Sequence, residues 1–236
     1  MTDEPRNKPV ASLLHFLIFL AIITAVAGLG WLQAMQTRNA APSHASAIPV
    51  YLSAAVLDWL LFFFCWRGVR KNGGTLRDII GGRWPTVDAF FKDLLIAAAF
   101  WGATAGILWW LARPGMPFHS PESKIVAALL PQTPLEAAVW FSVCMTAGFC
   151  EEFVFRGYVQ RQCAAYGRSV FAGVIGQAVI FGLGHAYQGP VQVASIILFG
   201  LFFGVLAAWV KSLRPGMMAH AWEDLWSGWL AAVLLR

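Results

Sequence analysis

Apolar runs, each about as long as a bilayer is thick, follow one another through the sequence. A helix needs about 20 consecutive apolar residues to cross the hydrocarbon core of a membrane, and such runs recur from Val10 to Leu235. Hydrophobic residues make up 58% of the chain and charged residues only 12%. Soluble globular domains have a much more charged composition. We therefore expect an all-α polytopic membrane protein.

Turn residues between the runs predict about seven transmembrane helices. The expected spans are Val10–Leu32, Val50–Trp66, Val87–Leu111, a fourth that begins at Pro134, Val170–Tyr187, Val191–Val210 and Met217–Leu235. The first run exceeds the roughly 7–15 apolar residues of a signal peptide, so we expect it to be retained. Short helices are expected at Thr75–Ile80 and Lys124–Leu130. We assign residues 1–133 to an N-terminal part with a basic loop, and residues 134–236 to a second, C-terminal part.

Basic residues predict how the helices are oriented. Five of them lie in the loop from residue 67 to residue 83: Arg67, Arg70, Lys71, Arg77 and Arg83. Loops rich in Lys and Arg stay on the cytoplasmic side, which places the N-terminus in the cytoplasm. The net charge of +5 is then explained by these loops rather than by binding to nucleic acid. Together with the short loops, it is typical of the bacterial cytoplasmic membrane.

The fourth apolar run contains three ionisable residues, Glu151, Glu152 and Arg156. On a helix, Glu152 and Arg156 stand at positions i and i+4 in the favourable order, with the acid first. Glu151 is turned away from this pair by about 100°. We expect Arg156 to hold Glu152 and Glu151 to be free for chemistry. The alternative is that all three form a polar packing network without chemistry.

Two further polar clusters lie in the later runs, Phe181-x-x-x-His185 and His220-x-x-x-Asp224. Ionisable groups at membrane depth are energetically expensive and usually functional. One histidine alone would be explained by packing, but two histidines and several acids on different helices favour a shared site. Asp58 lies in the second run. For this residue we favour a hydrogen bond to a neighbouring helix over a functional role.

These three motifs, in this order and about 34 residues apart, resemble those of the CPBP (CAAX protease and bacteriocin-processing, or Abi) family. Its members are intramembrane endopeptidases similar to the Ras-converting CAAX endopeptidase. The resemblance covers roughly residues 135–235 and implies a catalytic cavity between the C-terminal four helices. It also implies residue roles. Glu151 would activate water, His185 and His220 would hold the water and stabilise the oxyanion, and Glu152 and Arg156 would support them.

Asp224 occupies a position where the family often has Asn. An ionised carboxylate cannot donate a hydrogen bond to an oxyanion, so Asp224 is protonated, orients His220, or is a metal ligand. A set made of Glu151, His185, His220 and Asp224 could bind zinc or another divalent metal with water in an open position. We favour the glutamate mechanism without a metal or other cofactor.

A shared site places a condition on the fold. If the helices span fully, a rise of about 1.5 Å per residue puts His185 and His220 roughly 20 Å apart along the membrane normal. The two histidines can meet only if the turn Gln188-Gly189-Pro190 is sunk within the protein, or if the sixth helix is short or tilted. Irregular backbone at membrane depth is tolerated where protein buries it. We expect the sunken turn.

The favoured function is that of an intramembrane endopeptidase that cleaves a membrane-anchored protein or peptide close to its anchor. The substrate could be a prenylated C-terminus, a sorting tail, or a leader or bacteriocin-like peptide. The alternative is a non-catalytic membrane protein, such as an immunity factor, a scaffold or a transporter. Transporters often show an internal repeat with broken helices in both halves. In this sequence, the polar clusters are concentrated in the C-terminal part.

Overall fold

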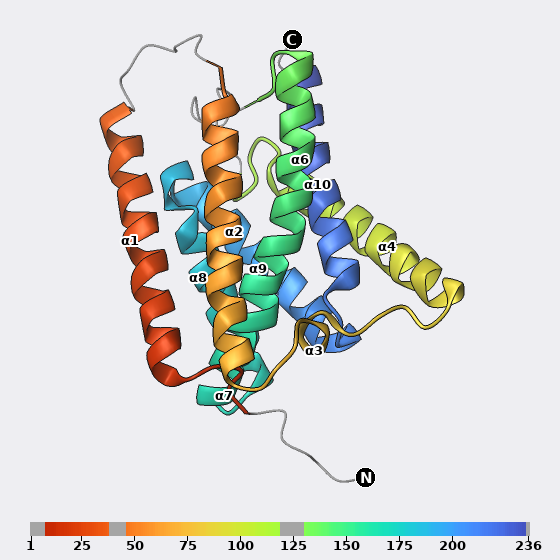
Figure 1. Cartoon of the computed structure of the whole chain (residues 1–236). Coiled ribbons are helices and arrows are strands. Elements are labelled where there is room, and N and C mark those ends of the chain that lie inside the picture. Colours follow the sequence, from red (N-terminus) through yellow and green to blue (C-terminus); the bar gives the residue numbers. More distant parts are fainter. Residues whose placement is uncertain (1–7, 38–45, 119–129, 235–236) are drawn as a thin grey trace.

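Helices account for the regular structure of the chain. The computed structural model describes residues 8–37, 46–118 and 130–234, and within these ranges it contains helices and turns but no strand (Figure 1). The elements are α1 Leu13–Thr37, α2 Ile48–Lys71, α3 Leu76–Ile80, α4 Val87–Leu111, α6 Pro134–Glu151, the π-helix η1 Glu152–Val159, α7 Gln160–Tyr166, α8 Val170–Gly184, the 3₁₀ turn η2 Ala186–Gln188, α9 Pro190–Val210 and α10 Arg214–Leu234. The all-α prediction is confirmed.

Five of the described helices are long and apolar enough to cross a membrane, which makes the chain an integral membrane protein. They are α1, α2, α4, the continuous helix of residues 134–166, and α9. Helix α8 is apolar but only 15 residues long, and α10 carries Arg214, Glu223 and Asp224. The count of seven spans and the orientation in the membrane therefore stay predictions. The helix expected at Lys124–Leu130 falls outside the described residues, except for Leu130.

The short helix expected near Thr75 is present as α3. Thr75 and Asp78 form a capping box, in which each side chain accepts a hydrogen bond from the backbone N–H of the other. Hydrogen bonds from the Thr75 hydroxyl and N–H lower the pKa of Asp78. Gly81, at a φ of 103°, ends the helix in the left-handed conformation that glycine favours.

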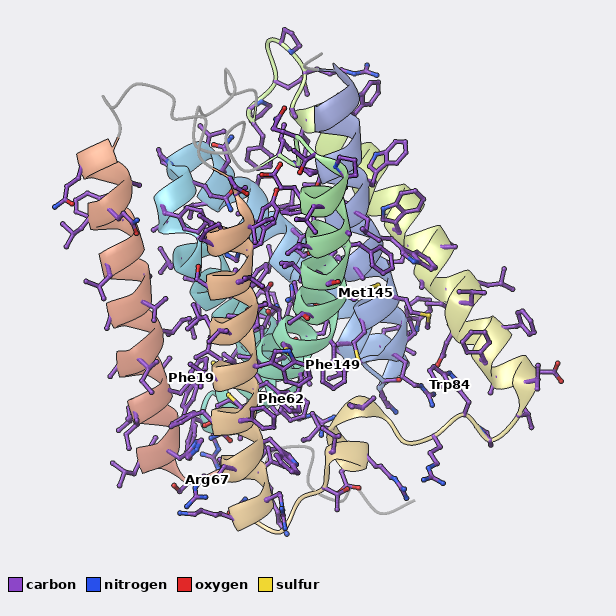
Figure 2. All side chains as sticks on the ribbon, turned by 45° about the horizontal axis from the view of Figure 1, so that its top comes forward. Phe19, Phe62, Arg67, Trp84, Met145 and Phe149 are labelled. Carbon is purple, nitrogen blue, oxygen red and sulfur yellow. The ribbon has the colours of Figure 1, made fainter. Side chains whose placement is uncertain are left out.

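Aromatic side chains join α2 to the long helix that begins with α6. The ring of Phe62 lies 5.3 Å from that of Phe149 and 4.7 Å from that of Phe153. Figure 2 shows Phe62 and Phe149 between the two helices, with Phe19 on the α1 side of α2. Burial of large aromatic side chains contributes strongly to packing energy. This contact holds α2 beside the turn that carries Glu151 and Glu152.

The connection between α8 and α9 differs from the expected end of the fifth span. Helix α8 ends at Gly184 rather than at Tyr187, and a 3₁₀ turn leads into α9. A 15-residue helix is about 22 Å long, shorter than the roughly 30 Å hydrocarbon core. Residues 184–189 are partly buried, and Tyr187 packs beside Gly30 of α1. In Figure 1 this connection lies below the upper ends of α1, α2 and α6, as expected for a sunken turn.

Candidate active site

Glu152 and Arg156 form an ion pair sealed inside the protein. Arg156 Nη1 lies 3.0 Å from Glu152 Oε1, and both side chains are at most 1% exposed. The guanidinium also lies over the ring of Phe181, 4.5 Å from its centre. The i, i+4 pairing expected from the sequence is therefore present.

The backbone around this pair differs from the regular α-helix that the i, i+4 spacing of Glu152 and Arg156 predicts. From Glu152 to Val159 the chain forms a π-helix, and all eight of its residues are buried. π-helical turns are rare and occur frequently at functional sites. The π-helix begins directly after Glu151. Glu151 is therefore the last residue of α6, whereas Glu152 is the first of the buried residues of η1.

His220, from α10, lies between the two glutamates. Its Nδ1 is 2.9 Å from Glu152 Oε1, and because a carboxylate only accepts, Nδ1 carries the hydrogen and donates it. The opposite nitrogen, Nε2, is 3.6 Å from Glu151 Oε2 and 3.8 Å from Asp224 Oδ2. These two distances are longer than hydrogen bonds, and the three groups are close enough for one water or substrate atom beside them to contact more than one of them.

Burial separates the supporting groups from the accessible ones. His220 is 3% exposed, and its imidazole is surrounded by the rings of Phe181, Phe199 and Phe203, at centroid distances of 6.2, 5.1 and 5.5 Å. The side chains of Glu151 and Asp224 are 18% and 32% exposed. Solvent or a substrate can therefore reach Glu151 and Asp224, whereas Glu152 and Arg156 lie behind them.

His185 lies in the same aromatic group but outside the ion pairs. It caps the C-terminus of α8, where its Nδ1–H donates to the carbonyl oxygen of Phe181 at 2.9 Å. Its ring lies 4.9 Å from that of Phe181, which in turn lies 6.2 Å from the ring of His220. The two histidines are thus much closer than fully spanning helices would allow. The structure brings His185 to the edge of the site rather than into contact with Glu151.

The possible metal ligands of the described residues are not grouped in a way that would hold an ion. Across the described parts of the chain, no group of three or more His, Cys, Asp or Glu side chains has the geometry to hold a metal ion. His220 Nδ1 is already bound to Glu152, and His185 Nδ1 to a backbone carbonyl.

Sequence reasoning missed the aromatic wall that α9 supplies. Phe199 and Phe203 stand one turn apart, their rings are 4.2 Å from each other, and both face His220. Their i, i+4 spacing was visible, but an apolar span contains many such pairs. Nothing in the sequence indicated that this pair, rather than another, faces the histidine.

Gly148 lets α6 and α10 approach closely enough for the site to form. A Cβ atom at this position would lie 2.7 Å from the Met217 carbonyl oxygen and 2.9 Å from Ala221. We expect Gly148→Ala to lower the free energy of unfolding by about 1–3 kcal/mol, because the added methyl group overpacks the contact. Displacing His220 by about 1 Å would also lower any catalytic rate by up to about 100-fold. Thermal unfolding in detergent and a cleavage assay check both effects.

The matched control is Gly102→Ala in α4, where an added Cβ meets nothing within 4 Å. This substitution is expected to be neutral or to stabilise by up to about 1 kcal/mol, since alanine favours helix more than glycine does. Equal behaviour of the two variants would contradict the close contact at Gly148.

Comparison with known proteins gives one family match. A model of the family described as Rce1-like, type II CAAX prenyl endopeptidase, matches residues 133–226. This range begins at the N-cap of α6 and contains the three polar motifs, and it confirms the family resemblance read from the sequence. Helices α1, α2 and α4 lie outside it. No curated protein and no solved structure matches the chain.

Proposed function

We propose that this membrane protein hydrolyses a peptide bond in a membrane-anchored substrate, because residues 133–226 match a model of the family described as Rce1-like, type II CAAX prenyl endopeptidase. The observation that carries the proposal is the position of His220. It is fixed by Glu152 on one side and presents its other nitrogen to Glu151 across a gap of 3.6 Å. Two groups at this distance can both form hydrogen bonds to one water that lies beside them.

Glu151 is the general base of the proposed reaction. Its carboxylate takes a proton from water while the water oxygen attacks the carbonyl carbon of the scissile bond. The negative charge that develops on the carbonyl oxygen requires a donor already in place. His220 supplies this donor at Nε2 in its imidazolium form, which donates from both ring nitrogens while Glu152 holds the Nδ1–H. Glu151 then returns the proton to the departing nitrogen as the C–N bond breaks.

The remaining residues support these two groups. Arg156 neutralises Glu152, which keeps the carboxylate available to orient His220. Asp224, 3.8 Å from His220 Nε2, limits the direction in which the imidazole can turn. His185, beside Phe181, provides a second donor for the oxyanion from Nε2 when its ring is protonated, since the Phe181 carbonyl holds its Nδ1–H.

The proposed mechanism predicts that a chelator leaves cleavage unchanged. Detergent-purified protein should contain less than about 0.1 equivalent of zinc or other divalent transition metal. Cleavage of a membrane-anchored peptide should persist within about twofold in the presence of EDTA or phenanthroline, because each step uses side chains of the chain itself. Stoichiometric metal that disappears in His185→Ala, together with chelator-sensitive cleavage, would contradict the metal-free mechanism and favour metal catalysis.

A further inference from the structure

A groove of about 520 Å³ opens beside the basic loop of residues 67–83. Residues from the connection between α3 and α4, from the end of α6 and from the first turns of α10 line it. Figure 2 labels two of them, Trp84 before α4 and Phe149 on α6. Ligand sites in proteins commonly have volumes of about 300–1,000 Å³. The groove is therefore large enough to hold part of a lipid molecule.

The inner part of the groove is apolar. It is formed by four partly buried side chains that pack against the hydrophobic core: Ile80, Phe149, Met217 and Met218. Methionine side chains are flexible and adapt to the shape of a bound apolar group. Helix α4 and the continuous helix of residues 134–166 are long and apolar enough to cross a membrane. The hydrocarbon around such helices contains lipid chains and no water, so an acyl chain is the apolar group at hand to fill the groove.

The mouth of the groove is built from an arginine, a tryptophan and a buried aspartate. Arg214 Nε lies 2.8 Å from Asp93 Oδ2, and Trp84 Nε1–H donates to the same oxygen at 2.8 Å. The guanidinium of Arg214 also lies over the ring of Trp84, 5.0 Å from its centre. These contacts hold Trp84 in place although it is 42% exposed. Tryptophan is enriched where protein meets the lipid headgroups, which favours a mouth at headgroup level.

The charges at the mouth leave one arginine for an external anion. The lining residues include two arginines and no acid. Asp93 neutralises Arg214. Arg83 is exposed, and it forms no ion pair within residues 8–37, 46–118 and 130–234. Guanidinium groups bind phosphate oxygens through paired hydrogen bonds. A phosphodiester attached to acyl chains therefore matches both the charge of the mouth and the apolar interior.

We propose that this groove binds one anionic phospholipid, with its phosphate at Arg83 and an acyl chain along Met217 and Met218. Anionic headgroups are attracted to basic segments at the membrane surface, and here the basic loop itself contributes to the site. Met217 lies one helical turn before His220. A lipid in the groove would thus support the start of the helix that carries this histidine. The site goes beyond the proposed function, because lipid binding needs no catalysis.

The test is a thermal unfolding titration of the delipidated chain in a neutral detergent. The probes are dioctanoyl phosphatidylglycerol, dioctanoyl phosphatidylcholine and glycerol phosphate. They present an anionic headgroup with chains, a zwitterionic headgroup with the same chains, and an anionic headgroup alone. A ligand that binds only the folded state raises the unfolding midpoint as it saturates the site. We expect this for phosphatidylglycerol, with an apparent affinity at least about tenfold above that of phosphatidylcholine, and no shift for glycerol phosphate.

Two variants locate the site. Arg83→Gln should weaken the apparent affinity for phosphatidylglycerol on the order of tenfold, because it removes charge-assisted hydrogen bonds to the phosphate. Arg77→Gln is the matched control. Arg77 is an exposed arginine of the same loop that does not line the groove, and its replacement should leave the affinity unchanged.

Three results would overturn the inference. Equal shifts with phosphatidylglycerol and phosphatidylcholine would show a groove that accepts any apolar chain, including that of a substrate. A shift with glycerol phosphate alone would show an anion site that needs no lipid. Equal losses of affinity in Arg83→Gln and Arg77→Gln would show general attraction to the basic loop. The selectivity of the wild-type chain decides the matter even if a variant fails to fold, and each of these results leaves the proposed protease function standing.

Discussion

Glu151→Gln is expected to abolish peptide hydrolysis and to leave the fold intact. The substitution keeps the size of the side chain but removes the carboxylate that accepts a proton from water. Loss of a general base typically lowers a rate by about 100- to 10,000-fold. Glu151 is 18% exposed, and Arg156 pairs with Glu152 instead. The thermal unfolding midpoint should therefore change little. Cleavage in liposomes and thermal unfolding in detergent measure the two effects separately.

Glu152→Gln provides the contrast within the same motif. Glu152 is sealed and holds both Arg156 and His220, so its replacement should lower the unfolding midpoint clearly. If Glu151→Gln destabilised the protein as much as Glu152→Gln does, or if it retained wild-type cleavage, the division between a free and a held glutamate would be wrong.

Arg156→Met is expected to give the largest loss of stability, about 3–5 kcal/mol. Arg156 is 1% exposed, and its removal leaves the carboxylate of Glu152 buried without its guanidinium partner, which is the costly way to break such a pair. Chemical unfolding in detergent measures the loss. Arg77→Met serves as the control, because Arg77 is exposed on α3, and such surface substitutions usually change stability by about 0.5 kcal/mol or less.

A double variant separates the charge from the packing. In Glu152→Gln/Arg156→Met both charges are gone, and the Gln side-chain carbonyl can still accept a hydrogen bond from His220 Nδ1. At least half of the stability lost in Arg156→Met should return, since interacting residues are not additive. If the stability losses of Glu152→Gln and Arg156→Met sum to the loss of the double variant, the two side chains do not interact.

Local patterns in the sequence were enough to predict the helices and the pairing within one helix. The i, i+4 relation of Glu152 and Arg156 survives because both residues belong to one continuous helical segment. The π-helical form of that segment was not predictable, since it depends on the burial of all its residues against neighbouring helices. Apolar length alone also overestimated the fifth span, which ends at Gly184.

Contacts between helices were the part that sequence could not supply. The resemblance of the motifs grouped His220 with Glu151, but it gave no reason for His220 to be held by Glu152. Asp58 was interpreted as a hydrogen-bonding residue because nothing in the spacing of α2 relates it to a motif almost a hundred residues later. How α2 and α10 pack against α6 depends on contacts between helices, which only the three-dimensional structure shows.

The most direct measurement is to incubate the purified chain, reconstituted in liposomes, with a library of membrane-anchored peptides and to identify new termini by mass spectrometry. The account predicts new N- and C-termini within a few residues of the anchor for wild-type protein and none for Glu151→Gln. Wild-type protein that folds, remains in the membrane and produces no new termini would contradict the protease function. The polar cluster would then be the binding site of a non-catalytic membrane protein.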